Sequence, residues 1–192
     1  MLFRSGLVHT PDHCPIANDW LTFGLDVNMN SIDTIQTLAE ILLSKHWKLA
    51  VAESCTGGLV CATLTELAGS SEWFERGYIT YSNLAKQESL DVEVSLLDSF
   101  GAVSEPVAKV MAEGAQANAG VNAAISITGI AGPTGGTPEK PVGTVCFAWA
   151  IQNDAGENRV LTKTMHFAGD RHAIREQSCH YVLNELAKLL ED

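Results

Sequence analysis

The chain has 192 residues, of which 46% are hydrophobic and 18% are charged, so it is long and apolar enough to form one domain with a sizeable core. Its formal net charge is −11 and its basic residues are scattered singly, which disfavours binding to nucleic-acid backbones and to anionic membrane surfaces. Its five cysteines form no CxxC pair, and no apolar run approaches the roughly 18–20 residues that span a bilayer, so we expect a cytoplasmic protein without a disulfide framework or a zinc site.

Residues 1–30 differ in pattern from the rest of the chain. They mix Pro11, Pro15 and Trp20 with no sustained periodicity, whereas a clear amphipathic pattern begins at residue 31. We interpret residues 1–30 as a poorly ordered N-terminal extension, with a docking arm or a true start at Met29 as alternatives. The folded domain is expected to span residues 31–192.

From residue 31 onward the pattern alternates between helices and strands. Helices are expected over residues 31–43, 57–67, 84–97 (in pieces), 104–118 and 171–190. Strands are expected over residues 48–53, 76–82 and 123–128, followed by a hairpin of residues 144–151 and 159–167. This order predicts an α/β fold, a three-layer α/β/α sandwich around a mixed, mostly parallel sheet with a late antiparallel hairpin.

The sequence AESCTGG at residues 52–58 marks a turn from a strand into a helix. Backbone N–H groups at the start of a helix have no partners within the helix, and the helix dipole adds partial positive charge there. Two glycines let a ligand approach the backbone closely. Such a turn binds an anion or stabilises an oxyanion, here at the amides of Thr56 and Gly57. In the alternative interpretation, Ser54 or Thr56 only caps the helix.

A second polar cluster follows the next expected strand, where Tyr81, Asn83 and Lys86 come close together in the sequence. A serine hydroxyl is a weak nucleophile until a base removes its proton, and no histidine of this chain lies in an obvious catalytic setting. A lysine can serve as that base if burial lowers its pKa. By position alone, however, Lys86 is better explained as an exposed helix lysine.

The segment at residues 129–143 is a long loop with five glycines and three prolines. A loop of this length in a compact domain is usually functional, and its glycines can surround a phosphate or a ribose. It is not a GxxxxGK[ST] phosphate loop, because Lys140 is followed by proline, so an ordered surface lid is the alternative. Arg171, which opens the last helix, could bind a phosphate or could pair with Asp170 or Glu176.

Taken in order, the segments AESCTGG, WFERGYITYSNLAK, GAVSEP, SITGIAGPTGGTPEKPVGTV and FAGDR resemble the CinA C-terminal domain family. The resemblance covers residues 31–190 and leaves residues 1–30 outside. Stand-alone members of this family are described as nicotinamide-nucleotide amidohydrolases. The resemblance therefore implies hydrolysis of nicotinamide mononucleotide (NMN) to nicotinic acid mononucleotide and ammonia, within pyridine-nucleotide recycling.

The resemblance also assigns roles to residues. Ser54 matches the serine nucleophile of the family, and Tyr81 and Lys86 match its tyrosine and lysine. As our own hypothesis, Lys86 takes the Ser54 proton, directly or through Tyr81. Cys55 is a rival nucleophile. No metal and no cofactor are implied, the partner is a small nucleotide, and a homodimer is possible. The residues expected to contact the substrate are Glu53, Cys55, Thr56, Gly57, Asn83, Thr128, Gly129, Gly132, Lys140 and Arg171.

Two other functions remain open at this stage. The same glycines would serve a non-catalytic module that binds pyridine nucleotides, and such a module would not need Lys86. The historical name of the family also suggests an interaction protein linked to DNA uptake or recombination, although the net charge makes direct DNA contact improbable.

Overall fold

The computed structural model describes residues 29–153 and 155–191. Its helices are α1 (Met29–Ser44), α2 (Leu59–Thr65), α3 (Asn83–Leu90), α4 (Val94–Phe100), α5 (Glu105–Ala119) and α6 (Arg171–Glu191), with a short 3₁₀ turn at Ser70–Glu72. Its strands are β1 (Leu49–Glu53), β2 (Phe74–Ile79), β3 (Ala123–Gly129), β4 (Thr144–Gln152) and β5 (Asn158–His166). The extension expected at residues 1–30 lies almost wholly outside the described residues.

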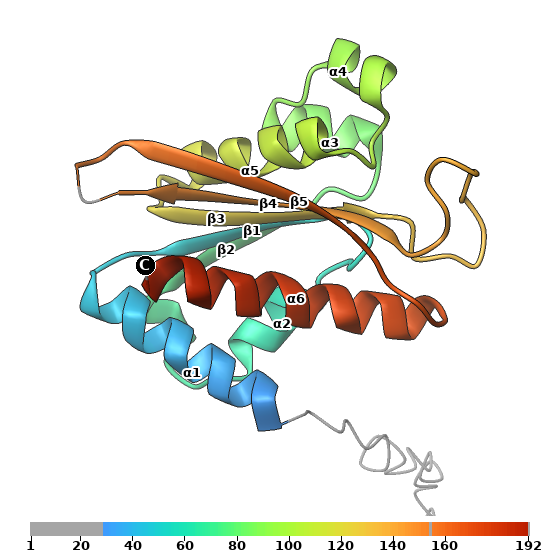
Figure 1. Cartoon of the computed structure of the whole chain (residues 1–192). Coiled ribbons are helices and arrows are strands. Elements are labelled where there is room, and N and C mark those ends of the chain that lie inside the picture. Colours follow the sequence, from blue (N-terminus) through green and yellow to red (C-terminus); the bar gives the residue numbers. More distant parts are fainter. Residues whose placement is uncertain (1–28, 154, 192) are drawn as a thin grey trace, which may run out of the picture.

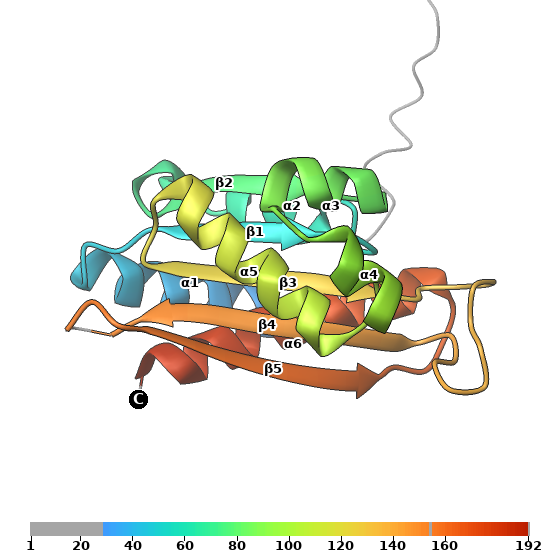
Figure 2. The same cartoon turned by 90° about the horizontal axis from the view of Figure 1, so that it is seen from above.

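The five strands form one mixed sheet in the order β2-β1-β3-β4-β5. Strand β1 pairs in parallel with β2 and with β3, whereas β4 is antiparallel to both β3 and β5. Helices α1, α2 and α6 cover one face of the sheet, and α3, α4 and α5 cover the other (Figures 1 and 2). The predicted three-layer sandwich with a late antiparallel hairpin is therefore confirmed.

Strand β1 is buried along its whole length because it contributes to a core on each face of the sheet. Leu49 and Val51 belong to the larger core, under α1, α2 and α6. Ala50 and Ala52 belong to the smaller core, under α4 and α5. A parallel strand covered on both faces reads as a continuous apolar run, which is why its alternation was invisible in the sequence.

The connections after β1 and β2 differ from the sequence expectation in their boundaries. Helix α2 begins at Leu59 and not at residue 57, because Gly57 and Gly58 have φ angles of 59° and 97°, which a right-handed helix excludes. Strand β2 ends at Ile79 and not at Ser82, because the hydroxyl of Ser82 accepts a hydrogen bond from the amide of Ala85 and caps α3.

The carboxyl ends of the three parallel strands meet at one edge of the sheet, as they must when neighbouring strands run in the same direction. The residues after β1, β2 and β3 therefore come together there, and the end of β5 leads from the same edge into α6. No helix within the described ranges is both long enough and apolar enough to cross a membrane.

Candidate active site

Ser54 and Lys86 meet at this edge of the sheet. Ser54 directly follows β1, and its amide donates to the carbonyl of Ile127 on β3, which fixes its backbone. Lys86 lies in the first half of α3, and its Nζ is 3.0 Å from the Oγ of Ser54. Both side chains are buried, and Lys86 is only 1% exposed. The structure thus brings together a hydroxyl and an amine that the sequence separates by 32 positions.

The surroundings of Lys86 favour its neutral form. Burial lowers the pKa of the amine, because the interior solvates the charged form less well than water does. Its second contact is the carbonyl of Thr80, which accepts from Nζ at 2.8 Å. No carboxylate among the described residues forms an ion pair with it. A neutral amine can donate to Thr80 and still accept a proton from Ser54, which is what a general base requires.

Cys55 lies beside this pair but is a poor candidate for the nucleophile. Burial is the main cause that raises the pKa of its thiol, to about 12, and the negative charge of Glu53 adds to the effect. Because the thiolate is the reactive form of cysteine, a thiol with such a pKa is inert near neutral pH.

A cavity of about 210 Å³ opens over the Ser54–Lys86 pair. It includes eight residues singled out from the sequence. It also includes Ala102, Val103 and Ala131, which sequence reasoning did not select because small apolar side chains carry no chemical signal. The side chain of Thr128 donates to the carbonyl of Ala102 at 2.8 Å and holds this wall in place. The complete lining is Ser54, Cys55, Tyr81, Asn83, Lys86, Ala102, Val103, Thr128, Gly129, Ala131 and Arg171.

Arg171 and Tyr81 lie together in this lining. The guanidinium of Arg171 donates to the carbonyl of Gly132 at 2.9 Å and to the hydroxyl of Tyr81 at 3.0 Å. It does not pair with Asp170, whose carboxylate accepts from the amide of Ala173, nor with Glu176, which lies 3.3 Å from His172. Of the two proton routes expected, the geometry favours the direct one, since Lys86 contacts Ser54 and the hydroxyl of Tyr81, a 60% exposed residue, is engaged by Arg171.

Most backbone amides at the helix start after Ser54 are already engaged, whereas the sequence analysis expected them to be free. The carboxylate of Glu53 accepts from the amides of Gly58, Cys61 and Val60, at 2.8, 2.9 and 3.3 Å. Glu53 is fully buried and is not part of the cavity lining, so the geometry does not support its predicted contact with the substrate.

Thr56 and Gly57, also predicted as substrate contacts, lie outside the cavity lining, and their two amides, proposed for the oxyanion, are not equivalent. The amide of Gly57 donates to the carbonyl of Ser54 at 3.1 Å and is therefore already engaged. The amide of Thr56 has no acceptor in the described part of the chain. The carbonyl of Thr56 accepts from Arg175 on α6 at 2.7 Å, a contact that sequence reasoning missed.

Lys140 of the glycine-rich loop does not reach the cavity. Its amine donates to the carbonyls of Phe100 and Val103, at 2.8 and 2.7 Å, and so ties the loop to the connection between α4 and α5. Gly132, also predicted as a substrate contact, lies outside the lining and contributes its carbonyl to Arg171. Lys140 and Gly132 therefore hold lining residues in place by hydrogen bonds and do not themselves line the cavity.

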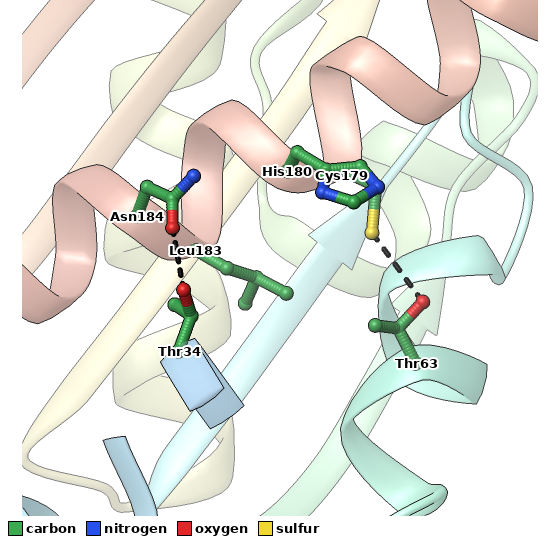
Figure 3. A pocket seen from close by; sticks show the side chains of 6 residues that line it. All are labelled: Thr34, Thr63, Cys179, His180, Leu183 and Asn184. Carbon is green, nitrogen blue, oxygen red and sulfur yellow. Dashed lines mark hydrogen bonds between the residues drawn. The ribbon is translucent and has the colours of Figure 1, made fainter. Parts of the chain in front are cut away.

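Other cavities lack comparable chemistry. One of about 260 Å³ lies at the opposite edge of the sheet, between the end of α1, the β4–β5 turn and the end of α6, and contains no paired nucleophile and base. Another, between α1, α2 and α6, measures only about 10 Å³, which is room for one water molecule at most (Figure 3). Within residues 29–153 and 155–191, no three metal-ligating side chains cluster.

Comparison with known proteins places the chain in a family. The model of the CinA C-terminal domain matches residues 32–190. The chain belongs to the CinA C-terminal domain family. This confirms the resemblance drawn from the sequence motifs.

Among members of the CinA C-terminal domain family, the chain is 51% identical to the nicotinamide-nucleotide amidohydrolase PncC of Enterobacter agglomerans, over 74% of this chain and 84% of the relative. It is 47% identical to the protein of the same name from Escherichia coli K12, over 79% and 89% of the two chains. A CinA-like protein of Syntrophobacter fumaroxidans is 49% identical over 82% of this chain, which spans only 36% of that longer relative.

Solved structures of the CinA C-terminal domain family have the same fold. The competence/damage inducible protein CihA of Agrobacterium tumefaciens superimposes with a TM-score of 0.79 at 38% identity, over 85% of this chain and 96% of the other. A CinA superfamily protein of Klebsiella pneumoniae gives a TM-score of 0.78 at 35% identity, over 84% and 98%.

Proposed function

We propose that this protein hydrolyses the carboxamide of NMN, giving nicotinic acid mononucleotide and ammonia, as a step of pyridine-nucleotide recycling in the cytoplasm. The observation that carries the proposal is the 3.0 Å contact between the Ser54 hydroxyl and the buried Lys86 amine, within a cavity large enough for a small ligand. Two relatives named as nicotinamide-nucleotide amidohydrolases, each matched over most of its length, support the choice of substrate.

The first half of the reaction forms an acyl-enzyme. Neutral Lys86 accepts the proton of the Ser54 hydroxyl as Oγ attacks the carboxamide carbon, which becomes tetrahedral. When the tetrahedral intermediate collapses, the C–N bond breaks and Lys86 returns the proton to the departing nitrogen, which leaves as ammonia. In the second half, Lys86 takes a proton from water, the resulting hydroxide attacks the ester, and the proton returns to Ser54.

Two features lower the barrier to attack. Thr56 is buried outside the cavity lining, but its amide has no other acceptor in the described structure and is the candidate donor to the oxyanion; loss of one such donor typically costs roughly 3–4 kcal/mol. The pyridinium ring of NMN withdraws electrons from its own carboxamide. A serine of moderate nucleophilicity is therefore sufficient.

The cationic side of the cavity orients the substrate. With the carboxamide at Ser54, the phosphate is placed toward Arg171, whose planar fork suits bidentate contacts with phosphate oxygens. The ring of Tyr81 lies beside Arg171 and offers an aromatic face to the cationic pyridinium.

An ammonia-release assay tests the proposal. The purified full chain is incubated with NMN, and ammonia and nicotinic acid mononucleotide are measured beside Ser54→Ala. We expect turnover by the wild type, none above background by Ser54→Ala, and identical circular dichroism spectra. Near wild-type turnover by the variant would exclude Ser54 as the nucleophile. Binding of NMN without turnover by the wild type would favour the non-catalytic module instead.

A further inference from the structure

Glu53 immediately precedes the nucleophile, yet its side chain takes no part in lining the cavity. It is fully buried, and its two carboxylate oxygens accept the three amides of Gly58, Val60 and Cys61. No ion pair of Glu53 occurs in the part of the chain that the structure describes. The carboxylate is therefore held by backbone amides and by the dipole at the start of α2.

These contacts close a short loop of chain around Ser54. The backbone leaves β1 at Glu53, turns through Ser54 and Gly57, and returns at Gly58 to the carboxylate of the same Glu53. Inside this loop the amide of Gly57 also donates to the carbonyl of Ser54. The seven residues of α2 are too few to be stable as a helix by themselves, so the carboxylate is a main restraint on the direction in which the turn leaves the sheet.

The backbone of Glu53 also reaches the base. Its carbonyl accepts from the amide of Thr80 at 2.8 Å, and the carbonyl of Thr80 accepts from the Nζ of Lys86. Because Lys86 in turn contacts Ser54, the contacts form a closed circuit from Glu53 through Thr80 and Lys86 to Ser54 and back along the chain. One residue thus joins the support of the nucleophile to the support of the base.

We propose that Glu53 is a positioning residue, whose carboxylate fixes the turn that carries Ser54 at the distance from Lys86 required for proton transfer. The inference rests on the proposed amidase reaction and adds to it a residue that touches neither the substrate nor the reacting atoms. A misplacement of about 1 Å between reacting groups can reduce the rate roughly a hundredfold, so a restraint on this turn acts directly on turnover.

The three amide donors explain why position 53 carries a carboxylate and not the amide of a glutamine. A carboxylate has only acceptor sites, whereas the amide of glutamine has one acceptor oxygen and an NH₂ group that would face an N–H donor. Glu53→Gln therefore keeps the size of the side chain and loses at least one of the three contacts. Burial raises the pKa of the Cys61 thiol, and the negative charge of Glu53 raises it further.

The test compares Glu53→Gln and Glu53→Ala with a control residue on α6. Asn184→Ala removes the hydrogen bond that the Thr34 hydroxyl donates to Asn184, in the small pocket between α1 and α6 (Figure 3). For each full-length variant, kcat and KM with NMN are measured, together with the rate at which a small fluorophosphonate labels Ser54. Labelling reports the activation of the serine without depending on the natural substrate.

For Glu53→Gln we expect kcat and the labelling rate to fall together by about ten- to a hundredfold, with KM within about twofold of the wild-type value. Asn184→Ala should keep the wild-type kcat and labelling rate, even if it lowers the melting temperature as much as Glu53→Gln does. Wild-type rates in a folded Glu53→Gln protein would overturn the proposal, and so would a raised KM with unchanged kcat, which would indicate a substrate contact.

These measurements also distinguish a failure of the Glu53 proposal from a failure of the proposed substrate. Labelling of wild-type Ser54 without hydrolysis of NMN would reject the substrate, and the labelling rates would still decide the role of Glu53. Absence of labelling in the wild type would overturn both, since Ser54 would then not be activated. If Glu53→Ala does not fold, the isosteric Glu53→Gln carries the test.

Discussion

The amine of Lys86 lies 3.0 Å from the hydroxyl oxygen of Ser54 and 2.8 Å from the carbonyl of Thr80. The two side chains meet because β1 and β2 are adjacent and parallel, so that the residues following each strand emerge at the same edge of the sheet. The pair is set in the interior, where an amine is more easily kept neutral than at the surface.

Replacing Lys86 tests its role as the base. Lys86→Met removes the proton acceptor. Lys86→Arg introduces a guanidinium that stays protonated at every accessible pH and so cannot accept a proton. Both variants should lose about a hundredfold to ten-thousandfold in kcat with NMN, the range that general base catalysis supplies. Substantial activity in Lys86→Arg would show that only the charge matters. Circular dichroism checks that each variant is folded.

The pH dependence of kcat/KM should report the titration of Lys86. The protonated amine cannot accept the serine proton, so activity should fall tenfold per pH unit below the pKa of Lys86 and level off above it. Burial lowers this pKa from the ordinary value of 10.5, so the inflection should lie below 10.5. Measurements above pH 7, where the substrate phosphate is already ionised, avoid its own titration near pH 6.

An inflection near 12 would contradict this assignment and would point to the thiol of Cys55, whose pKa burial raises to about that value.

Cys55→Ser should keep at least about half of the wild-type kcat. The thiol of Cys55 stays protonated near neutral pH, so it contributes no nucleophile, and a serine at the same place changes the lining of the cavity only slightly. The measurement is steady-state ammonia release, with iodoacetamide treatment of the wild type as a second arm. A loss of more than about a hundredfold in Cys55→Ser would make the thiol the attacking group.

Arg171→Gln should weaken the binding of the phosphorylated substrate selectively. With the guanidinium gone, one or two charge-assisted hydrogen bonds to the phosphate are lost, each of about 1.5–3 kcal/mol, so KM for NMN should rise by at least roughly tenfold. The riboside lacks the phosphate and should show little change in kcat/KM. An equal loss with both substrates would place the phosphate elsewhere.

Tyr81→Phe serves as the companion variant for this experiment. It removes the hydroxyl that Arg171 holds and leaves the aromatic ring, so we expect a change of less than about fivefold in kcat. A loss as large as that of Lys86→Met would restore Tyr81 to a place in the proton transfer.

The elements of this fold follow closely from the sequence. Apolar runs, strand alternation and helical periodicity predicted every strand and the long helices to within a few residues, because these patterns are local properties of the sequence. The errors fall where special conformations decide, as at Gly57 and Gly58, whose positive φ angles delay the start of α2 by two residues.

The site was harder to predict because direction and burial are tertiary properties. Position alone left Lys86 as an exposed helix lysine, and only its packing beneath the end of β2 makes it a buried amine. Lys140 offered a charge for the phosphate, but the carbonyls of Phe100 and Val103, from a distant connection, accept its hydrogen bonds.

Glu53 could have been oriented from the sequence. Side chains alternate between the faces of a strand, so Glu53 shares the face of Leu49 and Val51, the face that α2 covers. A carboxylate on that face, just before a helix start, is well placed to accept the unpaired amides of the helix. Reading the turn without the strand period led to the prediction that Glu53 contacts the substrate.

The buried thiol of Cys55, next to Ser54, has a consequence for oxidative stress. Peroxides oxidise thiolates much faster than thiols, and a serine oxygen has no comparable oxidation chemistry. Because Cys55 is held as the thiol, hydrolysis by Ser54 should continue at peroxide concentrations that silence amidases built on a reactive cysteine. Under the proposed function, a cell exposed to oxidants would then keep this route for recycling its nicotinamide nucleotides.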